Sequence, residues 1–117
     1  MAIITPAKQF TFGRTHRVTW SNLTNGDTGE PWPMFGAADA TIHVFGTFTG
    51  SGTVTMQGSL EAVPATYFTL KDPQGNTMVY TDADAEMISQ VGGFIRPSVT
   101  GDGTTSITII GLFRSTM

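Results

Sequence analysis

The chain has 117 residues, of which 39% are hydrophobic and 13% are charged, and its formal net charge at pH 7 is −3. This length suits one domain with one hydrophobic core, so we expect a single β-sandwich domain over residues 1–117. The negative net charge argues against binding to nucleic acid, because non-specific binding needs clustered Lys and Arg. We therefore expect no nucleic-acid partner.

The chain has no cysteine, so it has neither a disulfide nor a thiolate metal site, and a reducing compartment is compatible with it. The N-terminal stretch MAIITPAKQF is too poor in apolar residues for a signal peptide. No later run approaches the roughly 20 apolar residues of a membrane span. We expect a protein that is made in the cytoplasm and has no membrane partner.

Alternation of apolar and polar residues predicts the first strand within residues 10–23, where Val18 and Trp20 share one face. Residues 25–33, NGDTGEPWP, are dense in Asn, Gly and Pro, which favour turns. They predict a long connection that carries Trp32. Together with the preceding strand, this connection makes residues 1–38 a candidate contact region.

Residues 39–48 and 53–60 alternate cleanly and are joined by the flexible stretch TGSG. This pattern predicts a β-hairpin. In the first of its strands the alternation places His43 and Phe45 on the outer face, opposite the core.

A second hairpin is predicted for residues 65–70 and 76–81, because the DPQGN stretch between them has Pro and Gly at positions that suit a tight reversal. Residues 82–93, DADAEMISQVGG, begin with acidic residues and end with glycines. They predict a helix of one or two turns.

The last hairpin is predicted within residues 94–110, FIRPSVTGDGTTSITII, with its two strands burying a common apolar face. Pro97 cannot donate a hydrogen bond to a neighbouring strand, so we expect this strand to lie at an edge or to bulge there. The adjacent Ile109 and Ile110 interrupt the alternation and predict a bulge near Gly111.

These elements amount to seven or eight short strands joined by Gly and Pro turns, with one short helix. No internal repeat or heptad pattern is present. The expected fold class is all-β, as a two-sheet β-sandwich or a jelly roll.

Residues that could carry a reaction are few. No G-x-S-x-G motif is present, and His43 on the predicted outer face is more consistent with a solvated or interfacial side chain than with a catalytic base. Asp82, Asp84 and Glu86 lack the glycine and the terminal glutamate of a calcium loop, so we assign them to the start of the helix. We expect no enzymatic activity, no cofactor and no metal.

Exposed apolar residues are the most informative feature. The PWPMFG loop either folds back over an open end of the sandwich or inserts into a partner. A small basic cluster near the N-terminus could meet an acidic patch on a protein partner. The candidate partner-binding residues are Trp32, Met34, Phe35, Phe45, Arg14 and Arg17.

Two runs, residues 45–60 (FGTFTGSGTVTMQGSL) and 94–114 (FIRPSVTGDGTTSITIIGLFR), resemble the capsid decoration, or cement, proteins of tailed bacteriophages. In such relatives a Gly-Ser-Gly hairpin, a DPQGN-like turn before a short helix and an F-I-R-P hairpin recur in this order. The first 40 residues take no part in the resemblance. The chain also departs from it at residues 61–67, where relatives often have Asp-Gly and a Trp.

The resemblance implies a stable β-module, often a homotrimer, on the outer face of a capsid where major capsid protein subunits meet. It implies the major capsid protein and further copies of the chain as partners. It also implies a location on the virion exterior after synthesis in the host cytoplasm.

Three other functions stay open. A tail or head-completion protein would share the fold and dock elsewhere, and an enzyme such as a glycan lyase or hydrolase lacks an identifiable acid/base pair. A carbohydrate-binding β-sandwich would need an aromatic platform for a sugar. Its candidate residues are Trp20, Trp32, Tyr67 and Tyr80.

Overall fold

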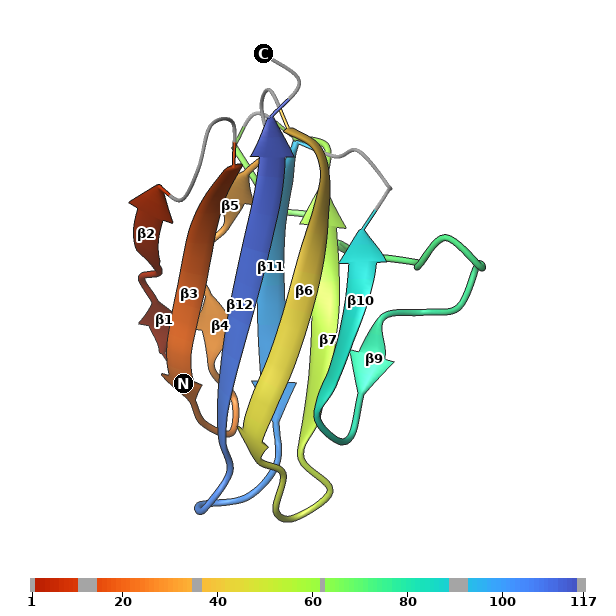
Figure 1. Ribbon diagram of the computed structural model, residues 1–117. Coiled ribbons are helices and arrows are strands. Elements are labelled where there is room, and N and C mark those ends of the chain that lie inside the picture. The colour runs from red at the N-terminus through yellow and green to blue at the C-terminus, as the bar shows by residue number, and fades with distance from the viewer. Residues whose placement is uncertain (1, 11–14, 35–36, 62, 89–92, 116–117) are drawn as a thin grey trace.

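The computed structural model describes residues 2–10, 15–34, 37–61, 63–88 and 93–115. Two β-sheets face each other across one core (Figure 1). The five-stranded sheet has the order β10-β6-β12-β3-β2. Its strands are β2 (Ala7–Phe10), β3 (Thr15–Leu23), β6 (Ala37–Thr47), β10 (Asp84–Ile88) and β12 (Ser106–Ser115).

The seven-stranded sheet has the order β1-β4-β11-β7-β8, with β5 paired to β11 and β9 paired to β7. It is built around two long strands, and the others are two-residue pieces along their edges. Its strands are β1 (Ile3–Ile4), β4 (Thr28–Gly29), β5 (Trp32–Pro33), β7 (Thr53–Ser59), β8 (Phe68–Thr69), β9 (Val79–Tyr80) and β11 (Phe94–Thr100).

The predicted all-β fold with two packed sheets is confirmed. The described residues form more strands than the seven or eight expected, because five of them have only two residues each. Segments this short carry no alternation that a sequence pattern could detect. The jelly-roll topology stays a prediction.

The core is made by the inward-facing residues of both sheets, as the alternation predicts. Trp20 is fully buried and its indole Nε1 donates to the Glu30 carbonyl at 3.0 Å. The Cβ of any side chain at Gly29 would lie 2.5 Å from both Trp20 and Pro97, so the indole is enclosed on that side. The other large, fully buried side chains are Phe113, Leu23, Ile42, Met56, Leu70, Met78, Ile88, Ile95, Ile107 and Ile109.

The helix predicted within residues 82–93 is wrong over its first half, and no helix occurs among the described residues. Asp84–Ile88 forms strand β10, which pairs antiparallel with β6 along five residues. Glu86 and Ile88 face inward and Met87 faces outward. The pairing energy offered by the edge of β6 outweighs the acidic first turn, which was only a weak helix signal. Residues 89–92 lie outside the described residues.

Two predicted hairpins are also wrong in their pairing. β6 and β7 lie in different sheets, and so do β11 and β12. β7 pairs instead with β11, and β6 pairs with β12. Most inward-facing residues were nevertheless predicted correctly, because alternation reports which side chains are buried and not whether the next strand lies beside or across the core. Leu60 was expected to face inward and is 72% exposed instead.

The two connections between the sheets meet at one end of the sandwich. The Thr49 hydroxyl donates to the Asp102 carboxylate at 2.7 Å, and the Thr105 hydroxyl donates to the Thr49 carbonyl at 2.9 Å. The backbone N–H and the hydroxyl of Thr104 also donate to Asp102. This network ties one connection to the other and fixes the spacing of the two sheets at this end.

We expect Asp102 to contribute pH-dependent stability. Hydrogen bonds from Thr49, and next from Thr104, lower the pKa of its carboxyl group from 3.8 to about 2. A carboxyl pKa that is lower in the folded than in the unfolded state stabilises the fold at pH values above its ordinary pKa. This contribution is lost as the pH falls through about 2. In urea titrations, Asp102→Asn is expected to be less stable than wild type at pH 7, with a difference that shrinks from about pH 4 to about pH 2. A difference independent of pH would contradict this assignment.

The predicted reversal at DPQGN is confirmed. The Asp72 carboxylate accepts the backbone N–H groups of Gln74 and Asn76, and the Gly75 N–H donates to the Asp72 carbonyl at 2.9 Å. Gly75 has a φ of 89°, which glycine adopts without strain.

Two local expectations need correction. Pro97 lies in an interior strand, where it is paired with Met56, and β4 and β5 leave a gap beside it on the other side.

Ile109 is buried and Ile110 faces outward, so β12 keeps its alternation. The irregularity lies on β3 instead, where the register shifts and Asn22 has a φ of 56°. Asn tolerates this conformation better than most residues.

Among the described residues, no helix is long and apolar enough to cross a membrane.

Candidate functional site

The outer face of the five-stranded sheet is formed by the residues that alternate with its buried ones. The pairing register aligns these residues in rows across the strands, since directly paired residues point to the same side. One row is Met87, Thr41, Leu112, Arg17 and Gln9. The next row is Ala85, His43, Ile110, Thr19 and Ala7. We call this surface the outer face.

The outer face carries several partly exposed apolar side chains. Leu112 is 41% exposed and Met87 is 43% exposed. Ile110 and Phe45 are half-buried, and the ring of Phe45 lies 4.9 Å from that of His43. Phe45 and Ile110 come from the neighbouring strands β6 and β12, whereas Thr41 on β6 lies between Leu112 and Met87. The exposed apolar side chains are therefore interspersed with polar ones.

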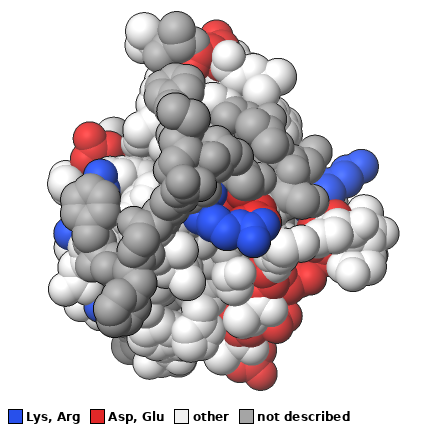
Figure 2. All heavy atoms as spheres, turned by 45° about the horizontal axis from the view of Figure 1, so that its top comes forward, with Lys and Arg blue, Asp and Glu red and all other residues white. Residues whose placement is uncertain are grey.

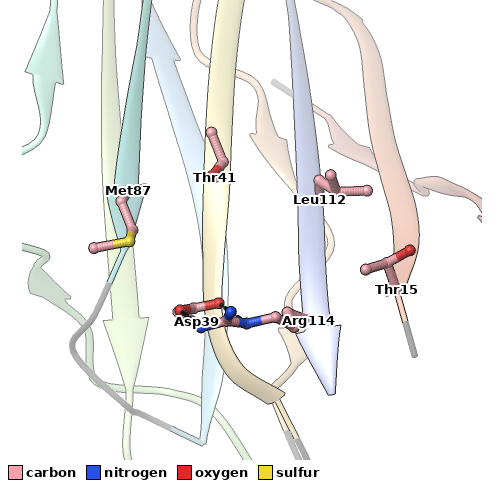
Figure 3. Close-up of a pocket in the computed structure, with 6 residues that line it drawn as sticks. All are labelled: Thr15, Asp39, Thr41, Met87, Leu112 and Arg114. Carbon is pink, nitrogen blue, oxygen red and sulfur yellow. Dashed lines mark hydrogen bonds and ion pairs between the residues drawn. The ribbon is translucent and has the colours of Figure 1, made fainter. Parts of the chain in front are cut away.

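A shallow hollow of about 290 Å³ lies at one end of the outer face (Figure 3). Met87 and Leu112 stand on its two sides, and an ion pair between Asp39 and Arg114 closes its end. Arg114 Nε donates to Asp39 Oδ1 at 3.1 Å, and a second Arg114 nitrogen donates to Oδ2, so the pair is bidentate. The charges of this pair compensate each other.

Few other charges lie on the outer face. Among its described residues, Arg17 carries the remaining charge, and its guanidinium donates to the side-chain oxygen of Gln9. Figure 2 shows the end of the molecule at the top of Figure 1, where most described atoms belong to uncharged residues. Asp and Glu gather on the side where Figure 1 places β9 and β10. The outer face itself presents little charge to a partner.

Trp32 lies away from the outer face, on β5 of the seven-stranded sheet. It is half-buried against the core, with Lys8 Nζ 5.5 Å and the His16 ring 6.2 Å from its ring centroid. The His16 ring also stacks on Phe113 at 5.5 Å. Burial, and next the charge of Lys8, lower the pKa of His16, which favours its neutral form. Trp32, His16 and Lys8 together form a mixed aromatic and cationic patch, which we call the Trp32 patch.

The predicted partner-binding residues therefore divide into separate places. Phe45 and Arg17 lie on the outer face, and Trp32 forms its own patch. Met34 is only 2% exposed and its N–H donates to the Gly93 carbonyl. Its side chain belongs to the core, as expected if the PWPMFG loop folds back over the sandwich, and it presents little surface to a partner. Phe35 and Arg14 lie outside the described residues.

Sequence reasoning missed three apolar residues of the outer face, Leu112 and Ile110 on the middle strand and Met87 on the edge strand β10. The assignment of 82–93 to a helix concealed the exposure of Met87. The supposed break in alternation at Ile109 and Ile110 concealed the other two. A strict period of two along β12 would have placed them outside.

The described residues hold no group of three or more His, Cys, Asp or Glu side chains arranged for a metal ion. Trp20 and Tyr80 are buried, and the guanidinium of Arg96 lies 3.6 Å from the ring centroid of Tyr67. Two of the four residues suggested as a sugar platform are therefore buried, and Arg96 lies against the ring of a third, Tyr67. The carbohydrate-binding alternative therefore keeps only Trp32 and Tyr67 as candidate contacts.

No protein-family model and no curated protein sequence matches the chain. Among solved structures, the fold is similar to that of the SPBc2 prophage-derived protein YomS, with a TM-score of 0.65, 12% sequence identity and coverage of 92% of this chain and 100% of that one. The chain thus shares its fold with a prophage-derived protein.

Two further solved structures are less similar. Recombinant oxalate oxidase gives a TM-score of 0.45 at 19% identity, over 86% of this chain and 41% of that one. Peruvianin-I, a cysteine peptidase from Thevetia peruviana latex, gives 0.39 at 13% identity, over 86% of this chain and 49% of that one.

Proposed function

We propose that this chain is a structural protein of a bacteriophage virion, and specifically a capsid decoration protein without enzymatic activity. It binds the outer capsid surface and stabilises contacts between major capsid protein subunits. The observation that carries the proposal is the likeness of fold to the prophage-derived protein YomS, which extends over 92% of this chain and all of that one. The resemblance of residues 45–60 and 94–114 to decoration proteins points the same way.

The physical properties of the molecule suit this role. Two sheets packed on an apolar core make a stiff platform, and the exposed apolar outer face gives it contact area. An ordinary protein contact hides about 800 Å² per partner. Repeated over a shell, contacts of modest affinity hold firmly through avidity.

The Trp32 patch is the proposed capsid contact. It joins the aromatic ring of Trp32 to the cationic Lys8 and comes from the N-terminal part of the chain, which takes no part in the family resemblance. Trp is among the residues that most often dominate binding energy at interfaces. The proposed state of the free protein is a homotrimer, as the resemblance implies.

Mixing purified protein with undecorated capsids tests the proposal. We expect negative-stain images to show added density on the outer capsid surface, and we expect Trp32→Ala to reduce the bound fraction in co-sedimentation by about tenfold or more. Val79→Ala is a matched control, because Val79 is an exposed apolar residue on β9 of the same sheet. Thermal melts establish that both variants are folded.

Three results would overturn parts of the proposal. Failure of the wild-type protein to bind capsids would contradict the decoration role. Density confined to the portal or the tail would favour a tail or head-completion protein instead. Equal binding by Trp32→Ala and Val79→Ala would remove the Trp32 patch from the contact.

A further inference from the structure

We propose that one proton, shared between the side chains of Asp72 and Glu86, acts as a pH-sensitive latch that holds the two sheets together along one edge of the sandwich. While the proton is bound, the two carboxyl groups are joined by a hydrogen bond. When the proton is lost at higher pH, two negative charges face each other and the edge loosens. We call Asp72, Tyr80 and Glu86 the latch. This goes beyond the proposed function, which gives these residues no role.

The latch residues come from both sheets. Glu86 lies on the edge strand β10 and is paired with the buried Ile42, so its side chain points between the sheets. Tyr80 lies on β9 of the seven-stranded sheet, and its hydroxyl donates to Glu86 Oε1 at 2.7 Å. Asp72 begins the DPQGN turn that precedes β9. Tyr80 and Asp72 are each only 6% exposed, so the latch closes the edge where Figure 1 places β9 and β10.

The contact between Asp72 and Glu86 requires a proton. Their carboxyl groups are hydrogen-bonded to each other, and an ionised carboxylate only accepts hydrogen bonds. Asp72 Oδ1 already accepts the backbone N–H groups of Gln74 and Asn76, which favours the ionised form of Asp72. The proton therefore resides on Glu86, which donates to Asp72 and accepts from Tyr80.

The charges around the latch act in the same direction. The hydrogen bond from Glu86 lowers the pKa of Asp72, and the two backbone hydrogen bonds lower it further against the effect of burial. The hydrogen bond from Tyr80 lowers the pKa of Glu86. The hydrogen bond with Asp72, burial and the charges of Asp72 and Asp84 raise it by more. Burial, and next the hydrogen bond to Glu86, raise the pKa of Tyr80, so its hydroxyl stays a donor. On the neighbouring strand β6, the residue paired with Glu86 is the uncharged Ile42.

The sign of the pH dependence follows from these shifts. The folded protein holds the Glu86 proton more tightly than the unfolded chain does. Its contribution to stability is therefore complete below the ordinary pKa of 4.5 and is lost as the pH rises through the raised pKa. The contribution of Asp72 is present above its ordinary pKa of 3.8 and is lost as the pH falls. The latch is thus closed in mildly acidic solution and weakens as the pH rises further.

A titration of the Glu86 carboxyl carbon by NMR tests the shared proton. We expect this group to titrate above pH 4.5 in the wild-type protein and at a lower pH in Asp72→Asn, because the substitution removes the adjacent negative charge. Asparagine keeps an oxygen that accepts the N–H groups of the turn. Asp84→Asn is the matched control, and a smaller downward shift is expected because Asp84 acts on Glu86 through its charge alone.

Urea unfolding of the wild-type protein and Glu86→Gln from about pH 5 to about pH 8 tests the effect on stability. Glutamine has the shape of a protonated glutamate and carries no charge, so the variant imitates the closed latch at every pH. We expect the wild-type midpoint to fall relative to that of Glu86→Gln as the pH rises. Hydrogen exchange of the β10 amides is expected to become about tenfold faster in the wild-type protein than in the variant over this range. Glu30→Gln is the matched control, since Glu30 is exposed and lies outside the latch.

Two kinds of result would overturn the inference. A Glu86 carboxyl group that titrates at or below its ordinary pKa in the wild-type protein would rule out the shared proton, and so would equal shifts in Asp72→Asn and Asp84→Asn. A difference between the wild-type protein and Glu86→Gln that stays constant with pH, as expected for Glu30→Gln, would contradict the latch. The titration uses the wild-type protein, so it decides the question even if a variant fails to fold.

Discussion

Replacement of Trp20 with alanine is expected to lower the free energy of unfolding by about 3–5 kcal/mol. Trp20 is fully buried at the centre of the sandwich, so its removal leaves a cavity that its neighbours fill only in part. The substitution also leaves the Glu30 carbonyl without the hydrogen bond that it accepts from the indole. Both effects act in the same direction.

Urea unfolding at neutral pH measures this change, and Ser21→Ala is its control. Ser21 is the next residue on β3, and its side chain is exposed. A surface substitution of this kind is expected to change the stability by less than about 0.5 kcal/mol. If Trp20→Ala cost no more than Ser21→Ala, the position of Trp20 in the core would be wrong.

Replacement of Gly46 with alanine is expected to cost about 2–5 kcal/mol, the second large effect. Gly46 has a φ of 135°, and a Cβ at this position would lie 2.3 Å from the backbone oxygen of Ser106 on β12. A backbone atom of a central strand is unable to rotate away as a flexible side chain would. Conformational strain and steric overlap therefore add together.

Two further glycines separate these contributions. Gly75 has a φ of 89°, and a Cβ added there would have no atom within 4 Å, so Gly75→Ala isolates the conformational strain, about 1–2 kcal/mol. Gly103 has open space and no positive φ, so its replacement is expected to be nearly neutral. Chemical denaturation of the three variants should rank Gly46 first, Gly75 second and Gly103 last. Equal costs at Gly46 and Gly75 would show that the chain relieves the overlap.

The acidic segment at 82–88 illustrates why one element was assigned wrongly. Asp82, Asp84 and Glu86 suit both the first turn of a helix and an exposed edge strand, and the segment is too short for its periodicity to decide. In the folded protein the unpaired edge of β6 is available to it, and five residues pair there. A partner distant in sequence therefore decided the conformation.

The candidate site likewise depends partly on local sequence patterns and partly on contacts between segments distant in sequence. Phe45 and Arg17 could be assigned to outward positions from alternation alone, and both are found on the outer face. That they share a face with Met87 and Leu112 depends on the strand order β10-β6-β12-β3, which no local pattern contains. The burial of Met34 likewise depends on how the loop that carries it packs against the core.

By itself, the sequence determined the all-β class, the tight turn at DPQGN and most of the inward-facing residues of the long strands. These properties depend on side-chain periodicity and on the φ preferences of Gly and Pro, which act over a few residues. Only the tertiary structure decided which strands share a sheet, and so which exposed side chains share a face. Turns that look like hairpins carry β6 to β7 and β11 to β12 from one sheet to the other. That choice depends on how both sheets together bury their apolar faces, which is a property of the whole chain.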